Sequence, residues 1–95
     1  MAAYIIVDVE VTDPEEYRTY TQQTPATIEK YGGKFPVRGG QTETLEGGWQ
    51  PQRFVVLEFP SVEQAKVWYS SPEYMAIIGI RHHAANSSMI LVQGV

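Results

Sequence analysis

The sequence predicts an α+β domain in which strands and helices follow one another in the order β-α-β-β-α-β. Two segments alternate between two sets of side chains with the period of a strand, Tyr4 to Val11 and Arg53 to Phe59. Helix starts follow both segments, at Asp13-Pro14-Glu15-Glu16 and at Ser61-Val62-Glu63-Gln64. Each of them supplies a side-chain cap and an acid or amide at the third helical position. This order is that of a ferredoxin-like split βαβ fold, an antiparallel four-stranded sheet with helices on one face.

The first helix is expected to run from Pro14 to about Tyr31, with proline at its first position. Pro25 lies inside it and is expected to kink or split it, because proline has no N–H and disfavours helical geometry at the preceding residue. Gly32-Gly33 then predicts a left-handed helix end. The stripe of this helix that faces the sheet should carry Tyr17, Tyr20, Thr24, Ile28 and Tyr31.

The second half supplies the remaining elements. Lys34 to Arg38 is expected at a sheet edge, because Pro36 cannot donate to a strand ladder. Gly39-Gly40 should break or bulge this strand. After the helix that begins at Ser61, Ser71-Pro72-Glu73 starts a further helical segment toward Ala85, and Met89 to Gln93 forms the last strand.

We interpret residues 1–95 as a single domain, since no repeat, linker or low-complexity segment interrupts the chain. The helices cover only one face of its sheet. The bare face is expected to carry Tyr4, Ile6, Phe54, Val56, Met89 and Leu91. A patch this apolar predicts a homodimer in which a second copy covers it.

Composition excludes several classes of function. The chain has no cysteine, so disulfides, thiolate metal sites and cysteine nucleophiles are ruled out. Its net charge is −4 and its seven basic residues are scattered, which argues against a nucleic-acid partner. The start MAAYIIVDVE contains neither a signal peptide nor a membrane span. We therefore expect a cytoplasmic protein with no membrane partner.

Over essentially its whole length the chain resembles a small bacterial family called domain of unknown function 1330, part of the dimeric α/β-barrel superfamily. The residues that carry the resemblance are Asp13-Pro14, Tyr17, Tyr31-Gly32-Gly33, Arg38-Gly39-Gly40, Glu46-Gly47, Trp49, Pro51, Glu58-Phe59-Pro60, Trp68-Tyr69, Ser71-Pro72-Glu73-Tyr74, Arg81 and Leu91-Val92-Gln93-Gly94-Val95. The resemblance implies a ferredoxin-like protomer and a dimeric α/β barrel. It leaves the chemistry open, since superfamily relatives include cofactor-free monooxygenases, haem enzymes, lactone isomerases and ligand sensors.

Arg38 with Gly39 and Gly40 is the first candidate binding element. A guanidinium beside two glycines can present its planar fork and open backbone amides to a carboxylate or similar anion. Alternatively, Arg38 pairs with Glu58 or Glu46 and the glycines only shape a bulge. No nucleotide-binding glycine pattern accompanies them.

Asp8 and Glu58 are candidate proton-transfer groups, which we expect to approach one another on the bare face of neighbouring strands. A carboxylate in a partly apolar cavity can act as a general base. Alternatively, these carboxylates form ion pairs with Arg38, Arg53 or Arg81.

His82 and His83 are adjacent, so on a helix they point about 100° apart and cannot chelate one metal together. Either one can serve as a proton shuttle or an axial haem ligand. The alternative is one exposed and one packed histidine at a helix end. Other members of the resembled family usually lack this pair, so it is a local departure.

Tyr17 and Trp68 are the aromatic residues most suited to contact a ligand, although aromatic stripes at helical spacing also form cores. We add Arg81 to the candidate ligand-binding residues. The chain is then interpreted as a dimer that binds a small polar or anionic molecule, aromatic ones included, without a metal or cofactor. Cofactor-independent acid–base catalysis, a non-catalytic ligand-binding or stress-related dimer, and a haem protein are the functions that remain open.

Overall fold

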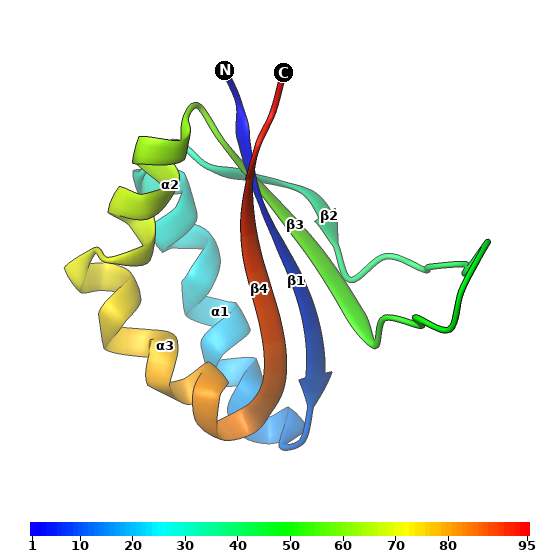
Figure 1. The fold of residues 1–95 in the computed structure, drawn as a ribbon. Helices are drawn as coiled ribbons and strands as arrows, with labels where there is room; N and C mark the ends of the chain where they lie inside the picture. The colour runs from blue at the N-terminus through cyan, green and yellow to red at the C-terminus, as the bar shows by residue number, and fades with distance from the viewer.

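A computed structural model describes all residues from Met1 to Val95. Along the chain its elements are β1 (Ala3–Val11), α1 (Pro14–Lys30), β2 (Lys34–Arg38), β3 (Arg53–Phe59), α2 (Val62–Tyr69), α3 (Pro72–Ala84) and β4 (Ala85–Gln93). The strands form one sheet in the order β2-β3-β1-β4, and every neighbouring pair is antiparallel. All three helices lie on one side of that sheet (Figure 1). The predicted ferredoxin-like α+β fold is confirmed, with β2 at the predicted sheet edge.

The core lies between the sheet and the helices. Every second residue of β1 and β3 faces the helices, and opposite residues share a face, as the pairs Ile5–Leu57 and Val7–Val55 show. The indole of Trp68 is fully buried, 4.1 Å from the ring of Tyr74, and donates from Nε1 to Oγ1 of Thr27 at 3.0 Å. One side chain of α2 thus fills the space between α1, α3 and the sheet.

The helix caps follow the sequence signals. Glu16 N–H donates to the Asp13 carboxylate at 3.1 Å, and Gln64 N–H donates to the Ser61 hydroxyl at 3.1 Å. Gly32 adopts the left-handed backbone with φ of 83° where α1 ends. These interactions confirm the predicted helix boundaries.

Pro25 does not split α1. The expectation that it kinks or splits the helix was therefore wrong about splitting. The helix continues from Pro14 through to Lys30. The hydroxyl of Thr24 donates to the carbonyl of Tyr20 at 2.6 Å, and that of Thr27 donates to the carbonyl of Thr24 at 2.8 Å. Side-chain hydrogen bonds and packing therefore hold the helix together around the N–H that proline lacks.

The last strand starts earlier and faces differently than predicted. It begins at Ala85, directly after α3, rather than at Met89. Ile6 pairs with Ile90 and Tyr4 pairs with Val92, so Ile90 and Val92 lie on the bare face. Met89 and Leu91 pack against the core instead. Their predicted place on the bare face was wrong, because a run of four apolar residues does not show which two point inward.

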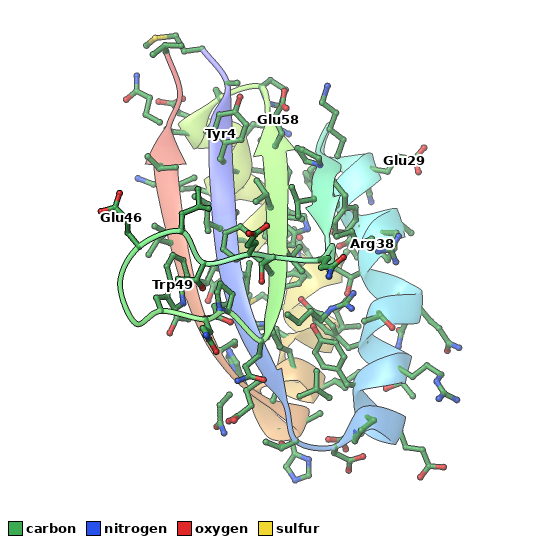
Figure 2. The ribbon with its side chains drawn as sticks, turned by 90° about the vertical axis from the view of Figure 1, so that its right-hand side faces the viewer. Tyr4, Glu29, Arg38, Glu46, Trp49 and Glu58 are labelled. Carbon is green, nitrogen blue, oxygen red and sulfur yellow. The ribbon has the colours of Figure 1, made fainter.

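The bare face is apolar at one end and covered at the other. Beyond Arg38 the chain leaves the sheet in a loop, residues 39–52, that arches over this face (Figures 1 and 2). Asp8 holds the loop there, because its carboxylate accepts from Trp49 Nε1 at 2.9 Å and from Gln52 N–H at 3.0 Å. The part that the loop leaves uncovered carries Tyr4, Ile6, Val37, Val56, Ile90 and Val92.

None of the three helices combines the length and the apolar character needed to cross a lipid bilayer.

Candidate functional site

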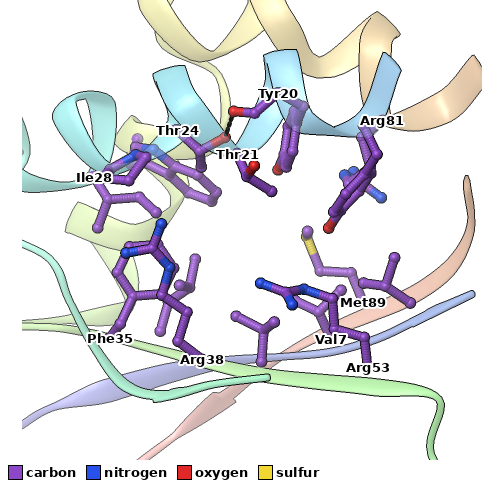
Figure 3. A pocket seen from close by; sticks show the side chains of 16 residues that line it. Val7, Tyr20, Thr21, Thr24, Ile28, Phe35, Arg38, Arg53, Arg81 and Met89 are labelled. Carbon is purple, nitrogen blue, oxygen red and sulfur yellow. Dashed lines mark hydrogen bonds between the residues drawn. The ribbon is translucent and has the colours of Figure 1, made fainter. Parts of the chain in front are cut away.

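A cavity lies between α1 and the helix-covered face of the sheet (Figure 3). Its empty space is about 480 Å³ with the solvent at its open side included, and about 40 Å³ is wide enough for the centre of a water molecule. Its lining comprises Val7, Val9, Tyr17, Tyr20, Thr21, Thr24, Pro25, Ile28, Phe35, Arg38, Arg53, Val55, Leu57, Trp68, Arg81 and Met89. One water needs roughly 10–15 Å³ by this measure, so the cavity accepts a group the size of a few waters.

Three arginines supply all the formal charge of this lining. Arg38 ends β2 and Arg53 begins β3, and Figure 3 shows both rising from the strand side toward the cavity. Arg81 approaches from α3 on the helix side. No carboxylate lines the cavity, and the three ion pairs of the protein, Lys30–Glu73, Lys34–Glu58 and His83–Glu16, lie elsewhere. Three cations thus share one largely apolar cavity without an acidic partner.

Arg81 is buried, and none of its polar partners is a carboxylate. Its Nε donates to the Tyr74 hydroxyl at 3.3 Å, its Nη1 donates to the Ser87 hydroxyl, and its Nη2 lies 3.5 Å from Nε2 of His82. The Tyr74 hydroxyl in turn lies 2.7 Å from that of Tyr20. These contacts fix the Arg81 guanidinium and leave its charge uncompensated.

Arg53 has an unused donor. Its Nε is buried and has no hydrogen-bond partner, the only such side-chain atom in the protein. A Cβ on Gly39 would lie 2.7 Å from Arg53 Nη1 and 3.0 Å from its Cζ, so the guanidinium rests against the Gly39 backbone. A buried N–H without a partner costs about 1–3 kcal/mol, more on a charged group. Such a donor gains a hydrogen bond if an acceptor is brought to it.

Arg38 is the most exposed of the three arginines. Its guanidinium carbon lies 4.8 Å from the ring centre of Phe35, a cation–π distance. It makes no ion pair with Glu58 or Glu46, so the ion pairs of the alternative interpretation are wrong. Gly39 accounts for the break in the strand, with φ of 71° and an N–H that donates to the Phe54 carbonyl at 2.8 Å.

Tyr17 and Tyr20 are the hydroxyl-bearing aromatics of the lining. Burial raises the pKa of Tyr17 although Arg53 and Arg81 act against it. Burial also raises the pKa of Tyr20 far above its ordinary value, and the neighbouring Tyr74 adds to the rise. Both residues therefore remain neutral hydroxyl donors near neutral pH.

Asp8 and Glu58 lie outside the cavity and apart from each other, so their expected approach was wrong. Tyr4 pairs with Glu58, and Asp8 is four residues further along β1. At strand geometry this separates the two carboxylates by about 13 Å. Glu58 lies 3.7 Å from Lys34 and Asp8 holds the loop, so neither carboxylate pairs with the arginines on the opposite face.

His82 and His83 are both exposed near the end of α3, so the expectation that one of them packs was wrong. Nδ1 of His83 lies 2.5 Å from Oε1 of Glu16 on α1. Neither histidine lines the cavity, and the protein brings no three histidine or carboxylate side chains together in a metal-binding group.

The Glu16–His83 pair predicts a specific pH dependence. Its hydrogen bond and charge raise the pKa of His83 above 6.5, with a smaller effect of Asp13. Because the folded value is raised, the pair stabilises the fold fully below the unfolded pKa and is lost as pH rises through the folded one. We expect Glu16→Gln to lower the pKa of His83, measured by NMR titration of its ring. Glu15→Gln is the control, since Glu15 makes no such contact, and an unchanged His83 pKa in Glu16→Gln would contradict the pair.

Arg53 is the one charged lining residue that was not among the predicted candidates. The signal was present, because Arg53 belongs to the same alternating set as Val55 and Leu57, which face the helices. Arg38 also pairs with Val55 and so shares that face. Trp68 and Tyr17 do line the cavity, while Gly39 lies against Arg53 and a Cβ added to Gly40 would meet nothing within 4 Å.

The fold and this site define a small ferredoxin-like α+β protein with an arginine-lined cavity between helix and sheet. The chain belongs to the family described as domain of unknown function (DUF1330), whose model matches residues 2–95. The predicted family resemblance is therefore confirmed. A comparison with proteins of curated function found no match to this chain.

Solved structures share the fold at low sequence identity. The RPA0582 protein of unknown function from Rhodopseudomonas palustris has a TM-score of 0.79 at 20% identity, covering 99% of this chain and 82% of that one. SnoaB, a cofactor-independent oxygenase from Streptomyces nogalater, has a TM-score of 0.67 at 13% identity, and the match covers 99% of this chain and 93% of SnoaB. A dimeric ferredoxin-like protein of unknown function from Bacteroides fragilis has a TM-score of 0.55 at 15% identity, covering 98% and 96%. At these identities the likeness concerns the fold alone.

Proposed function

We propose that this protein is a homodimer that binds a small anionic molecule in the cavity between α1 and the sheet. The observation that carries the proposal is the convergence of Arg38, Arg53 and Arg81 on a cavity without a carboxylate. Buried charges in proteins are ordinarily paired, because an unpaired ion loses its hydration without compensation. A bound anion supplies the missing partner.

The geometry supports binding more directly than acid–base catalysis. The lining contains no aspartate, glutamate or histidine, and Asp8, Glu58, His82 and His83 all lie outside it. Tyr17 and Tyr20 hold their protons near neutral pH, since burial raises the pKa of both. The cavity thus offers cations and neutral donors, which orient and stabilise an anion, and lacks a base poised to remove a proton.

Cofactor-independent oxygenation is a second candidate, favoured by the same arginines and by the likeness to SnoaB. Cations beside a substrate oxygen stabilise an electron-rich enolate or phenolate, the form that reacts with O₂. Oxidation of a CH₂ group to C=O would consume one O₂, placing one oxygen atom in the product and releasing the other as water. Oxygen uptake with phenolic substrates, abolished in Arg53→Gln, tests this candidate, and its absence leaves simple anion binding.

The homodimer follows from the uncovered part of the bare face. Ile90 is 59% exposed and Val92 is 41% exposed there, beside Ile6 and Val56. No element of the chain lies over this patch (Figure 2). A second copy presents the same patch, and two such sheets packed face to face would remove it from water. The Bacteroides fragilis protein with this fold is described as dimeric, which supports the proposal.

Anion binding predicts a measurable role for Arg38. Arg38→Lys keeps the charge but removes the planar fork, so binding of benzoate or inorganic phosphate should weaken about ten-fold, or about 1.4 kcal/mol. Calorimetric titration at constant ionic strength measures the change. Arg18→Lys is the matched control, because Arg18 is exposed on α1 and does not line the cavity. Equal binding by wild type and Arg38→Lys would remove Arg38 from the site, and no binding of either anion would overturn the proposed function.

A further inference from the structure

The donors that face the cavity differ from those of a typical phosphate site. Phosphates are usually held by helix N-termini and by clusters of free backbone N–H groups. Here α1 contributes residues from its interior turns, Tyr17 to Ile28, and the strands contribute residues whose backbones are paired within the sheet. The anion therefore has to be held by side chains, above all by guanidinium groups.

Arg53 is arranged to bind such an anion edge-on. Its Nε has no partner and is covered by neighbouring protein atoms, so a carboxylate reaches it only when side chains at the cavity shift. The Gly39 backbone supports the rest of the guanidinium. Nε and a neighbouring Nη point in parallel, which matches the two oxygens of a carboxylate. Arg38, across the cavity mouth from Arg53 in Figure 3, is exposed enough to swing from Phe35 onto the same anion.

The rest of the cavity selects an apolar body. Ten of its sixteen lining residues are hydrophobic, among them Val7, Val55, Leu57 and Met89. A doubly charged phosphate would place its remaining charge against these side chains, at a larger desolvation penalty than a singly charged group. The free space takes only a group the size of a few waters, so a short alkyl chain fits it most closely and a single ring requires side chains to move.

We infer that the ligand is a small monocarboxylate with a short alkyl or single-ring body, whose carboxylate is held edge-on by Arg53, the side chain that rests against the Gly39 backbone. This inference rests on the proposed function, since it specifies the anion that the same cavity takes. Arg53 and Gly39 become the residues that set specificity for a carboxylate. Arg81, held by Tyr74 and Ser87, contributes positive potential rather than the contact.

Two probes and three variants test it. Benzoate and inorganic phosphate are titrated separately at constant ionic strength while NMR follows the Arg53 Nε–Hε signal and the Gly39 amide. We expect benzoate to saturate both signals and to bind at least ten-fold more tightly than phosphate. Arg53→Lys should weaken benzoate at least ten-fold, because lysine cannot offer two parallel donors.

Gly39→Ala and Gly40→Ala form a matched pair. An added Cβ at Gly39 would press on Arg53 Nη1, whereas one at Gly40 would meet nothing within 4 Å. Gly39→Ala should therefore lose benzoate binding as Arg53→Lys does, and Gly40→Ala should bind like wild type. Circular dichroism checks that each variant is folded. The positive φ of Gly39 can make Gly39→Ala unstable. In that case the benzoate affinity of Arg53→Lys decides the test.

The outcomes separate the inference from the proposed function. Phosphate binding as tight as benzoate, or benzoate binding unchanged in Arg53→Lys, would overturn the inference and leave anion binding standing. Absence of any shift with either anion would overturn both. Loss of benzoate binding in Gly40→Ala as well as Gly39→Ala would remove Gly39 from its assigned role.

Discussion

Replacing Val56 by aspartate is expected to convert the proposed dimer into monomers. Val56 lies on the bare face, between its partners Ile6 on β1 and Val37 on β2. In the dimer an aspartate there would be an unpaired charge in an apolar contact, with a penalty of about 3–5 kcal/mol. Because the free energy of association adds to that of folding, the variant should also unfold at a lower temperature.

Light scattering at micromolar concentration measures this effect. Val67→Asp is the matched control, since Val67 is 48% exposed on α2, away from the bare face, and receives the same charge. The control should remain a dimer. A Val56→Asp variant that stays dimeric would place the interface elsewhere, and a folded wild-type monomer would overturn the homodimer itself.

Truncating Trp68 to alanine is expected to be the most destabilising single change in the core. The indole is fully buried, packs at 4.1 Å on Tyr74 and at 5.4 Å on Phe59, and donates to Thr27. Its removal leaves a cavity, with a loss of about 3–5 kcal/mol in the free energy of unfolding. The Thr27 hydroxyl loses the indole donor but still donates to the Thr24 carbonyl. The free energy of unfolding of a small domain is about 5–15 kcal/mol, so Trp68→Ala should remove a large part of it.

Urea denaturation followed by circular dichroism measures the loss. Trp49→Ala provides the comparison, because Trp49 is 60% exposed in the loop and contacts only the edge of Phe54 and the carboxylate of Asp8. We expect it to change the free energy of unfolding far less. A loss in Trp68→Ala no larger than in Trp49→Ala would show that the α2 contact does not organise this core.

Local signals in the sequence determined most of the fold. The alternation of Ile5, Val7 and Val9 depends only on the two-residue period of a strand. The caps at Asp13, Ser61 and Ser71 act within a few residues of themselves, and all three accept the predicted backbone hydrogen bonds. Such short-range chemistry can be predicted from sequence without knowledge of the rest of the chain.

The face on which each β4 side chain lies, and the register of β4 against β1, were less predictable from the sequence. Met89, Ile90, Leu91 and Val92 are all apolar, so their composition fits either orientation of β4. The orientation is decided by pairing with β1, where Ile6 meets Ile90, and by the immediate continuation of α3 into Ala85. The effect of Pro25 was also not predictable from its neighbours. Its local preference is to interrupt the helix, but packing against the sheet holds the helix together.

Some residues of the candidate site could likewise be predicted from the sequence, and others were found only in the tertiary structure. By itself the sequence singled out Arg38 with its glycines, Tyr17 and Trp68, because their residue types suit a ligand. Arg53 was not among the predicted candidates, although it alternates in step with Val55 and Leu57. Only the tertiary structure showed that Arg38, Arg53 and Arg81, from three separate elements, meet in one cavity without a carboxylate. It also removed Asp8 and Glu58 from that cavity and assigned Asp8 to the loop. The physical reason is that helix caps and strand alternation depend on neighbours in the chain, whereas the field inside a cavity depends on side chains brought together by strand pairing and helix packing.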